Sequence, residues 1–85
     1  MWIRSQDRKT LVNADKFSVS KEHEVFRIYS VNSFLGEYST EEKAMKVMDM
    51  IEDTILKCEA MRTGYAEYDF GAFVFDMPAD KDVEV

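Results

Sequence analysis

The feature that most constrains the fold is a long amphipathic segment that begins near Ser39. Apolar and small side chains recur there at three- and four-residue intervals, and counted at 100° per residue they share one stripe of an α-helix. The stripe contains Ala44, Val47, Met48, Ile51, Ile55 and Cys58, and the opposite face contains Glu42, Lys46, Asp49, Asp53 and Lys57. A helix of this kind buries its stripe against a second element of the fold.

Both ends of the predicted helix carry residues typical of helix boundaries. Ser39-Thr40-Glu41-Glu42 has the spacing of a capping box, with Ser39 as the N-cap and Glu42 at the third helical position. Gly64 suits the position that follows the last helical turn. These limits predict a helix over about residues 40–62, roughly 33 Å long at about 1.5 Å per residue.

The rest of the chain contains short segments that alternate between polar and apolar residues, as half-buried strands do. The clearest runs from Val25 to Val31, where Phe26 and Ile28 share one face. Gly36 lies within another such segment and suggests a β-bulge or a close approach of the backbone. Besides residues 25–31, strands are expected over residues 1–6, 10–13, 16–20, 34–38 and 72–76.

These elements predict an α+β fold. An antiparallel meander of three to five strands packs on the one long helix, and the final strand, about 72–76, returns beside an earlier strand. One domain is expected over residues 1–78, followed by a short acidic tail, frayed in solvent, over residues 79–85. The pattern does not decide which sheet edge receives the final strand. The side chains expected to face the helix are Ile3, Val12, Phe17, Phe26, Ile28, Leu35, Phe73 and Phe75.

Charge and composition limit the classes of function. The 85 residues carry a net charge of −6, and their lysines and arginines are scattered among acids, so neither a nucleic-acid-binding face nor attachment to an anionic membrane is expected. The single cysteine excludes an intramolecular disulfide. The N-terminus becomes polar within a few residues and no apolar run has the length of a membrane span, so we expect a cytoplasmic protein.

The residue types that most often perform catalysis are few and poorly placed. His23 lies between Glu22 and Glu24, which favours an exposed loop histidine over a general base held by a partner. These three neighbours point in alternating directions in an extended chain, so they do not favour a metal site. Cys58 falls on the apolar stripe, which favours a buried, unreactive thiol over a nucleophile.

The remaining acids and glycines also lack the spacing of a known site. The three glycines are too far apart for a phosphate-binding loop. The acids after the helix have no EF-hand spacing and favour a solvated surface, and they are Glu67, Asp69, Asp76, Asp80, Asp82 and Glu84. We therefore expect no catalytic residue, no metal and no cofactor.

More large apolar and aromatic side chains are present than a core of this size holds. Met45 and Leu56 lie to one side of the helix stripe, and Met50 and Met61 lie to the other. They are either covered by loops of the same chain or form an interface with a protein partner or a second copy. The same two interpretations, a minor cluster or a contact surface, apply to the aromatic residues Trp2, Tyr29, Tyr38, Tyr65, Tyr68 and Phe70.

Two segments carry a resemblance. The opening Met-Trp-Ile-Arg-Ser-Gln-Asp and the stretch from Leu35 to Ile51, which starts Leu-Gly-Glu-Tyr-Ser-Thr-Glu-Glu-Lys-Ala, resemble a group of short proteins of Gram-positive bacteria and their phages. The resemblance covers roughly residues 1–12 and 35–51. It implies membership of that group and no particular chemistry, so no functional residue is carried over from it.

The expected function is that of a non-enzymatic protein-interaction module, such as an accessory protein of a phage or mobile element. It would act through a protein partner or as a homodimer, with Met45, Met50, Leu56 and Met61 as the interface. A small-molecule-binding domain or weak enzyme that uses tyrosines and acids at one end of the sheet is the first alternative. An acidic DNA mimic or inhibitor protein is the second, and it requires the acids to form a continuous stripe.

Overall fold

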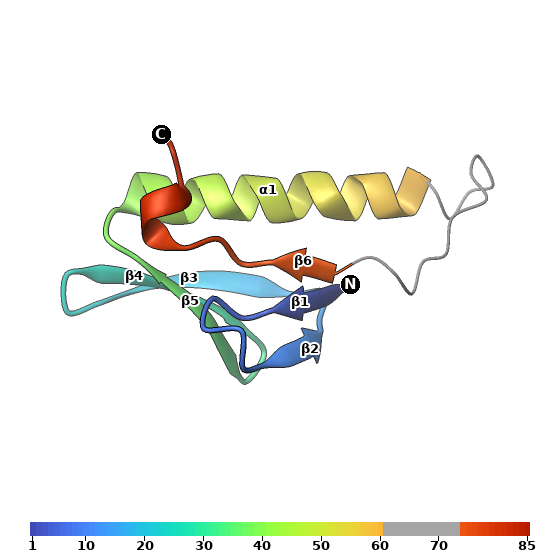
Figure 1. Ribbon diagram of the computed structural model, residues 1–85, viewed down its shortest axis with the longest axis horizontal. Helices are drawn as coiled ribbons and strands as arrows, with labels where there is room; N and C mark the ends of the chain where they lie inside the picture. The colour runs from blue at the N-terminus through green and yellow to red at the C-terminus, as the bar shows by residue number, and fades with distance from the viewer. Residues whose placement is uncertain (61–73) are drawn as a thin grey trace.

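A computed structural model of the chain describes residues 1–60 and 74–85, apart from the side chains of residues 58–60 (Figure 1). The fold is α+β, as the sequence predicts, with two small sheets and one long helix. In chain order the elements are β1 (Trp2–Arg4), β2 (Leu11–Asn13), β3 (Phe17–Glu22), β4 (Val25–Ser30), β5 (Ser33–Tyr38), α1 (Glu41–Ala60), β6 (Val74–Asp76) and a 3₁₀ turn (Asp80–Asp82).

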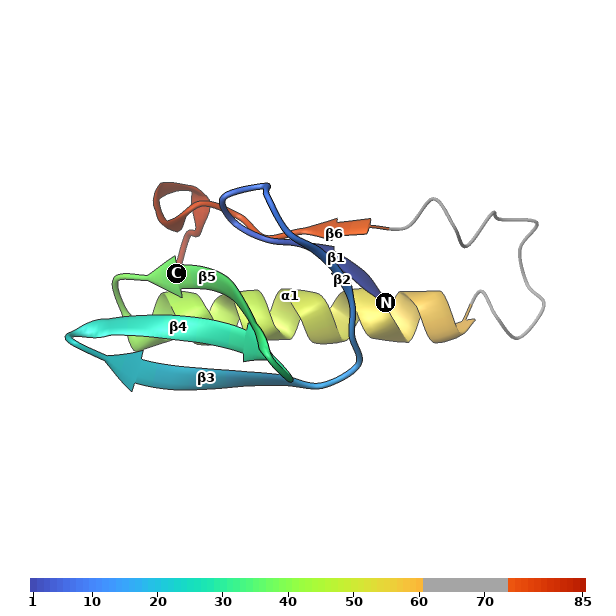
Figure 2. The same cartoon turned by 90° about the horizontal axis from the view of Figure 1, so that it is seen from below.

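The larger sheet is the predicted antiparallel meander. Its three strands follow chain order, β3-β4-β5, and α1 runs along one face of the sheet (Figures 1 and 2). β4 alternates apolar Phe26 and Ile28 with polar residues, so one face of the strand is buried under the helix and the other faces solvent. The helix therefore covers its apolar stripe with the sheet, as its periodicity requires.

The final strand completes a second sheet of order β2-β1-β6. β1 and β2 form an antiparallel hairpin, and β6 pairs parallel with β1, with Ile3 opposite Phe75. The backbone N–H of Met77 continues this pairing by donating to the carbonyl of Arg4 at 3.0 Å. The prediction that the last strand returns beside an earlier one is confirmed, but the strand joins a second sheet rather than the meander. Its partner is β1, at the opposite end of the sequence.

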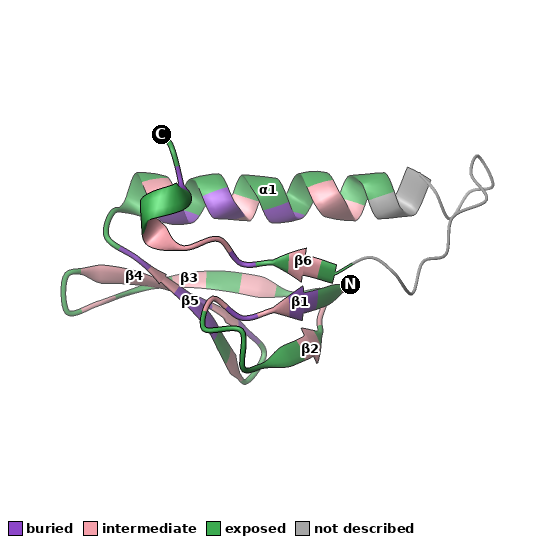
Figure 3. Ribbon diagram, in the orientation of Figure 1, coloured by how far each residue is buried: buried purple, intermediate pink, exposed green. Residues whose placement is uncertain are grey.

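The core lies between the helix and the two sheets (Figure 3). Ile3, Ile28 and Leu35, all predicted to face the helix, have no exposed surface. Val12, Phe17, Phe26 and Phe75 are partly buried against the core, while Phe73 lies outside the described residues. Among the described residues, the buried apolar side chains are those of Ile3, Ile28, Leu35, Tyr38, Ala44, Val47, Ile51, Met77 and Val83.

The predicted N-cap is wrong by one residue. The Thr40 hydroxyl, rather than that of Ser39, accepts the hydrogen bond from the Lys43 backbone N–H at 3.2 Å, and the helix begins at Glu41. Ser39 instead donates its N–H and its hydroxyl to the Asp80 carboxylate, at 2.8 and 3.0 Å. Glu42 is consequently the second helical residue, so no capping box forms.

The prediction of a frayed end over residues 79–85 is wrong for Asp80 to Val83. Val83 is buried in the core, and Lys43 donates to the Asp80 carbonyl at 2.9 Å. The hydrogen bond from the Ser39 backbone lowers the pKa of Asp80 below its ordinary value, and Lys43 adds to the effect. Because the folded pKa is lowered, the ionised carboxylate stabilises the fold above the unfolded pKa of about 4, and this stabilisation is lost as the pH falls through the folded pKa.

A β-bulge at Gly36 joins the two sheets. Ile28 pairs with Gly36 while Tyr29 pairs with Phe34, so Leu35 is the extra residue of the bulge, as Gly36 predicted. The Leu35 carbonyl accepts a hydrogen bond at 2.7 Å from the backbone N–H of Gln6, in the turn after β1. The bulge thus supplies a backbone acceptor to the neighbouring sheet.

Gln6 and Tyr38 extend this junction to the C-terminal segment. The Gln6 amide accepts from the N–H of Glu37 at 2.9 Å and donates to the carbonyls of Glu37 and Pro78 at 3.0 and 3.1 Å. The Tyr38 hydroxyl donates to the same Pro78 carbonyl at 2.7 Å. Tyr38 has no exposed surface, and burial raises the pKa of its phenol, with a smaller contribution from the charge of Asp80.

Gly36→Ala tests this junction. A Cβ at position 36 would lie 3.2 Å from the Tyr38 hydroxyl oxygen and 3.3 Å from its ring, which the bond to Pro78 holds in place. We expect a loss of about 1–3 kcal/mol in the free energy of unfolding, as for other overpacked sites, measured by urea denaturation. Ser33→Ala, in the same strand but away from Tyr38, is the matched control. An unchanged midpoint for Gly36→Ala would contradict the close packing described.

The β3–β4 turn has an unusual backbone for its sequence. Glu22 pairs with Val25 across a two-residue turn, and the turn residues His23 and Glu24 have φ angles of 50° and 66°. Two consecutive positive φ angles define a type I′ turn, which asparagine and glycine adopt much more readily than other residues. The backbone of this turn is therefore strained, although its twist matches that of the two strands it joins.

Replacing the turn by His23→Asn with Glu24→Gly should raise the free energy of unfolding by about 1 kcal/mol, because Asn-Gly favours the type I′ turn. Thermal unfolding followed by circular dichroism measures the change. Asn32→Gly, in the β4–β5 turn, is the control. Asn32 has no positive φ angle, so glycine there only increases the conformational entropy of the unfolded chain and should lower the free energy of unfolding. Equal effects of the two changes would contradict the assigned turn.

Candidate functional site

The structure describes only some of the residues considered for chemistry. His23 is exposed in the strained turn, as expected of a loop histidine. Within residues 1–60 and 74–85 no three His, Cys, Asp or Glu side chains are grouped as metal ligands. The Cys58 side chain, Glu67, Asp69, and the aromatic residues from 65 to 70 lie outside the described residues.

The exposed apolar residues of α1 form the first candidate surface. Met45 and Leu56 keep 47% and 60% of their surface exposed, although both belong to a helix that packs on a sheet. At 100° per residue they share one row with Asp49 and Glu52, which are also exposed. We call Met45, Asp49, Glu52 and Leu56 the acidic row. Its apolar ends are about 16 Å apart at about 1.5 Å per residue.

The opposite flank of α1 carries lysines, one of which, Lys57, forms an ion pair with Asp53 at 3.0 Å. Met50 is 38% exposed and lies there among Lys43, Lys46 and Lys57 by the same helical arithmetic. The two flanks are therefore distinct surfaces, and Met50 does not share one continuous patch with Met45 and Leu56. Met61, the fourth of them, lies outside the described residues.

The second candidate surface is the solvent face of the meander. Arg27 is central to it: its Nε donates to Glu37 at 3.0 Å, and its guanidinium lies 5.6 Å from the centroid of the Phe34 ring. Tyr29 packs against Phe34 at 5.7 Å between ring centroids. The register explains the arrangement, since Arg27 is directly opposite Glu37 and Tyr29 is opposite Phe34.

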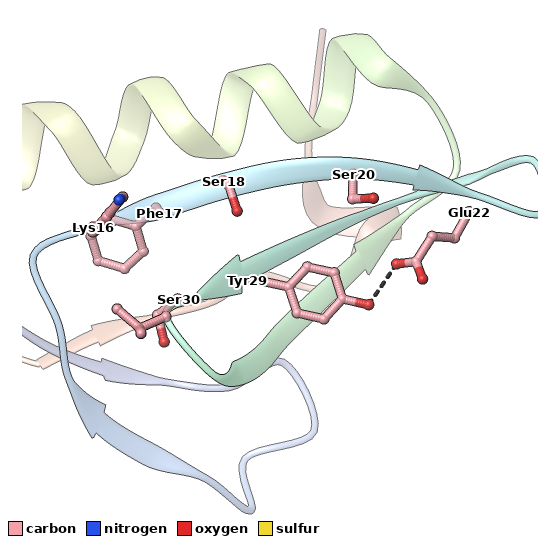
Figure 4. Close-up of a pocket in the computed structure, with 8 residues that line it drawn as sticks. Lys16, Phe17, Ser18, Ser20, Glu22, Tyr29 and Ser30 are labelled. Atoms are coloured by element: carbon pink, nitrogen blue, oxygen red, sulfur yellow. Dashed lines mark hydrogen bonds between the residues drawn. The ribbon is translucent and has the colours of Figure 1, made fainter.

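A shallow groove of about 440 Å³ runs along β3 on this same face (Figure 4). The Tyr29 hydroxyl donates to the Glu22 carboxylate within it, and Ser18 and Ser20 are exposed on the strand beside it. The groove is open to solvent, and the bond between Tyr29 and Glu22 joins two of its polar side chains. Its lining residues are Lys16, Phe17, Ser18, Ser20, Glu22, Tyr29, Ser30 and Val31.

The hydrogen bond to Glu22 raises the pKa of Tyr29, and desolvation adds to the rise. Glu22→Gln removes the negative charge that disfavours the phenolate, so the pKa of Tyr29 should fall toward the ordinary value of about 10. The pH titration of the Tyr29 ring signals by NMR measures it. Glu24→Gln, in the adjacent turn, should leave the Tyr29 pKa unchanged. An equal response to both substitutions would contradict the assigned bond.

The sequence pattern places Met45 and Leu56 off the apolar stripe of the helix but does not reveal the cluster around Arg27. The alternation in β4 places Arg27 and Tyr29 on one face, which is visible in the sequence. Their partners Glu37 and Phe34 depend on the register of β5 after the bulge, and the alternation within one strand does not show that register. The pairing of strands supplies this information.

Comparison of the chain with protein-family models, with curated proteins and with solved structures finds no match. No helix in the described residues is long and apolar enough to cross a membrane. The surfaces of the molecule therefore carry the evidence for its function.

Proposed function

We propose that this protein is a non-enzymatic interaction module that binds a partner protein through the acidic row of α1. The observation that carries the proposal is the exposure of Met45 and Leu56 at the two ends of this row. Burying both against a partner would remove apolar surface from water at two separate anchor points. The resemblance of the first segment and the helix start to phage-associated proteins supports an accessory protein of a phage or mobile element.

Charge favours a basic partner over a second copy at this row. Asp49 and Glu52 lie symmetrically about its middle, so a two-fold pairing of the row with itself would bring these acids together. Like charges placed directly opposite one another oppose association. A partner segment with lysine or arginine between two apolar residues would instead satisfy both the anchors and the acids.

The two alternatives have weaker support. A ligand-binding domain or weak enzyme usually binds its ligand in an enclosed pocket, whereas the groove beside Tyr29 and Glu22 is shallow and open. A DNA mimic requires a continuous acidic stripe, whereas the acidic row has apolar ends and the opposite flank of α1 carries Lys43, Lys46 and Lys57.

The Met45→Lys/Leu56→Lys double variant tests the proposal. Both side chains are exposed and lysine suits a helix, so the free energy of unfolding should change by less than about 1 kcal/mol. The full chain is used as bait in cells, the captured proteins are identified by mass spectrometry, and the strongest is purified. Its affinity, measured by calorimetry, should fall at least about tenfold with the double variant, because two anchors are lost and two positive charges face a basic partner.

Val31→Lys/Val85→Lys is the matched control, since these valines are 74% and 70% exposed and the same charge is added. It should bind the purified partner with unchanged affinity, and cross-links should join that partner to α1. Equal binding by both double variants, or cross-links only to other elements, would refute the acidic row as the binding surface.

A further inference from the structure

β3 is an unprotected sheet edge. It is the outer strand in the order β3-β4-β5, and Figure 2 shows it at the border of the sheet, with β4 on one side of it only. In the described chain no strand pairs with this border. β3 has six residues, a continuous register with β4, and neither proline nor glycine. A long regular edge without these interruptions is a template for pairing with another strand.

The hairpin geometry identifies the free backbone groups. Glu22 and Val25 close a two-residue turn, so they form a hydrogen-bonded pair, and such pairs alternate along an antiparallel ladder. Glu22, Ser20 and Ser18 therefore direct their backbone groups toward β4. The N–H and carbonyl groups of Phe17, Val19 and Lys21 point away from β4, toward the open side.

These free groups are symmetric about Val19. If two copies of β3 pair antiparallel with Val19 on a two-fold axis, Phe17 of each copy faces Lys21 of the other. The three free residues then pair only with one another and exchange roughly six backbone hydrogen bonds, two for each facing pair. If the register shifted by two residues in one direction, Phe17 would face the β3–β4 turn of the other copy. If it shifted in the other direction, Lys21 would face the loop before β3.

The side chains on the solvent face complement each other in the same register. Lys16 of one copy lies opposite Glu22 of the other, and the two-fold axis repeats this contact, so one dimer contains two such ion pairs. Ser18 lies opposite Ser20. Lys16 is exposed, and the Glu22 side chain is 35% exposed beside the groove. Opposite charges that face each other across strands stabilise the pairing. Both the backbone and the charge pattern thus select one register.

Lys21 is the residue that could oppose this pairing, because a charge on the buried side protects many sheet edges. Here it would face Phe17 of the second copy, rather than another charge. Its Nζ already lies 5.9 Å from the centroid of the Phe26 ring, and an aromatic neighbour favours a lysine. The charge is therefore accommodated in the symmetric arrangement.

We propose that two copies of this chain associate through β3, with Val19 on the two-fold axis, and join their two meanders into one continuous sheet. The occupant of the edge is a second copy of the chain, and the selecting interactions are the Lys16–Glu22 ion pairs. The proposal goes beyond the binding of a partner at the acidic row and does not depend on it, because the two surfaces belong to different elements.

Reciprocal charge reversal tests the register. Native chain should sediment as a dimer, whereas Lys16→Glu and Glu22→Lys should each raise the dimer dissociation constant at least about tenfold, since each places like charges opposite one another. An equimolar mixture of the two variants should form a heterodimer, because a carboxylate then faces an ammonium group at both contacts between positions 16 and 22. The double variant Lys16→Glu/Glu22→Lys should dimerise by itself for the same reason.

Lys46→Glu on α1 is the control, with the same change of charge at an exposed site, and it should dimerise as the native chain does. Circular dichroism checks that each variant folds. Hydrogen exchange gives a second measurement: the amides of Phe17, Val19 and Lys21 should be protected at high protein concentration and exchange rapidly on dilution.

A native chain that remains monomeric at millimolar concentration would overturn the proposal. So would a dimer that withstands both charge reversals, or a mixture that fails to associate although each variant is folded. A dimer lost in Met45→Lys/Leu56→Lys and retained in Lys16→Glu would move self-association to the acidic row and refute the β3 edge. A dimer that survives the former and is lost in the latter supports the β3 edge, whatever the fate of the partner at the acidic row.

Discussion

The rest of the structure depends on a hydrogen-bonded junction at the carbonyl oxygen of Pro78. Tyr38 at the end of β5 and Gln6 in the turn after β1 both donate to this atom. Tyr38 is fully buried, so its hydroxyl requires a partner inside the protein, and a buried hydroxyl left without one would cost about 1–3 kcal/mol. Gly36 is what allows the Tyr38 ring to lie against β5, since a Cβ there would crowd it.

The junction decides which surfaces of the molecule remain free. It brings the second sheet beside β5 through the bond from Gln6 to Leu35, so this side of the meander is covered. It also places Asp80 where it binds Ser39 and orients the start of α1 over the sheet. The opposite edge, β3, receives no such partner in the described chain. The free strand and the exposed flank of α1 are both consequences of where the C-terminal segment is anchored.

The helix start shows how far local pattern carries. Ser39 and Thr40 are adjacent hydroxyl residues, and either can cap a helix, so the sequence predicts the boundary but not the cap. Asp80 decides between them by taking both donors of Ser39, which leaves Thr40 to bind the N–H of Lys43. The prediction of a frayed acidic tail is wrong for the same reason. The composition of the tail resembles that of a solvated end, but Val83 packs in the core and Asp80 binds Lys43, which is distant in the sequence.

The sequence by itself determined the long helix, the alternating strands of the meander and the position of Met45 and Leu56 off the apolar stripe of the helix. Each follows from the periodicity of one short segment, which backbone geometry sets within a few residues. Tertiary structure alone decided that β6 pairs with β1, that Tyr38 is core, and that β3 is a free edge among the described strands. These outcomes depend on contacts between residues distant in the sequence, and competing strand pairings leave the local pattern of apolar residues unchanged.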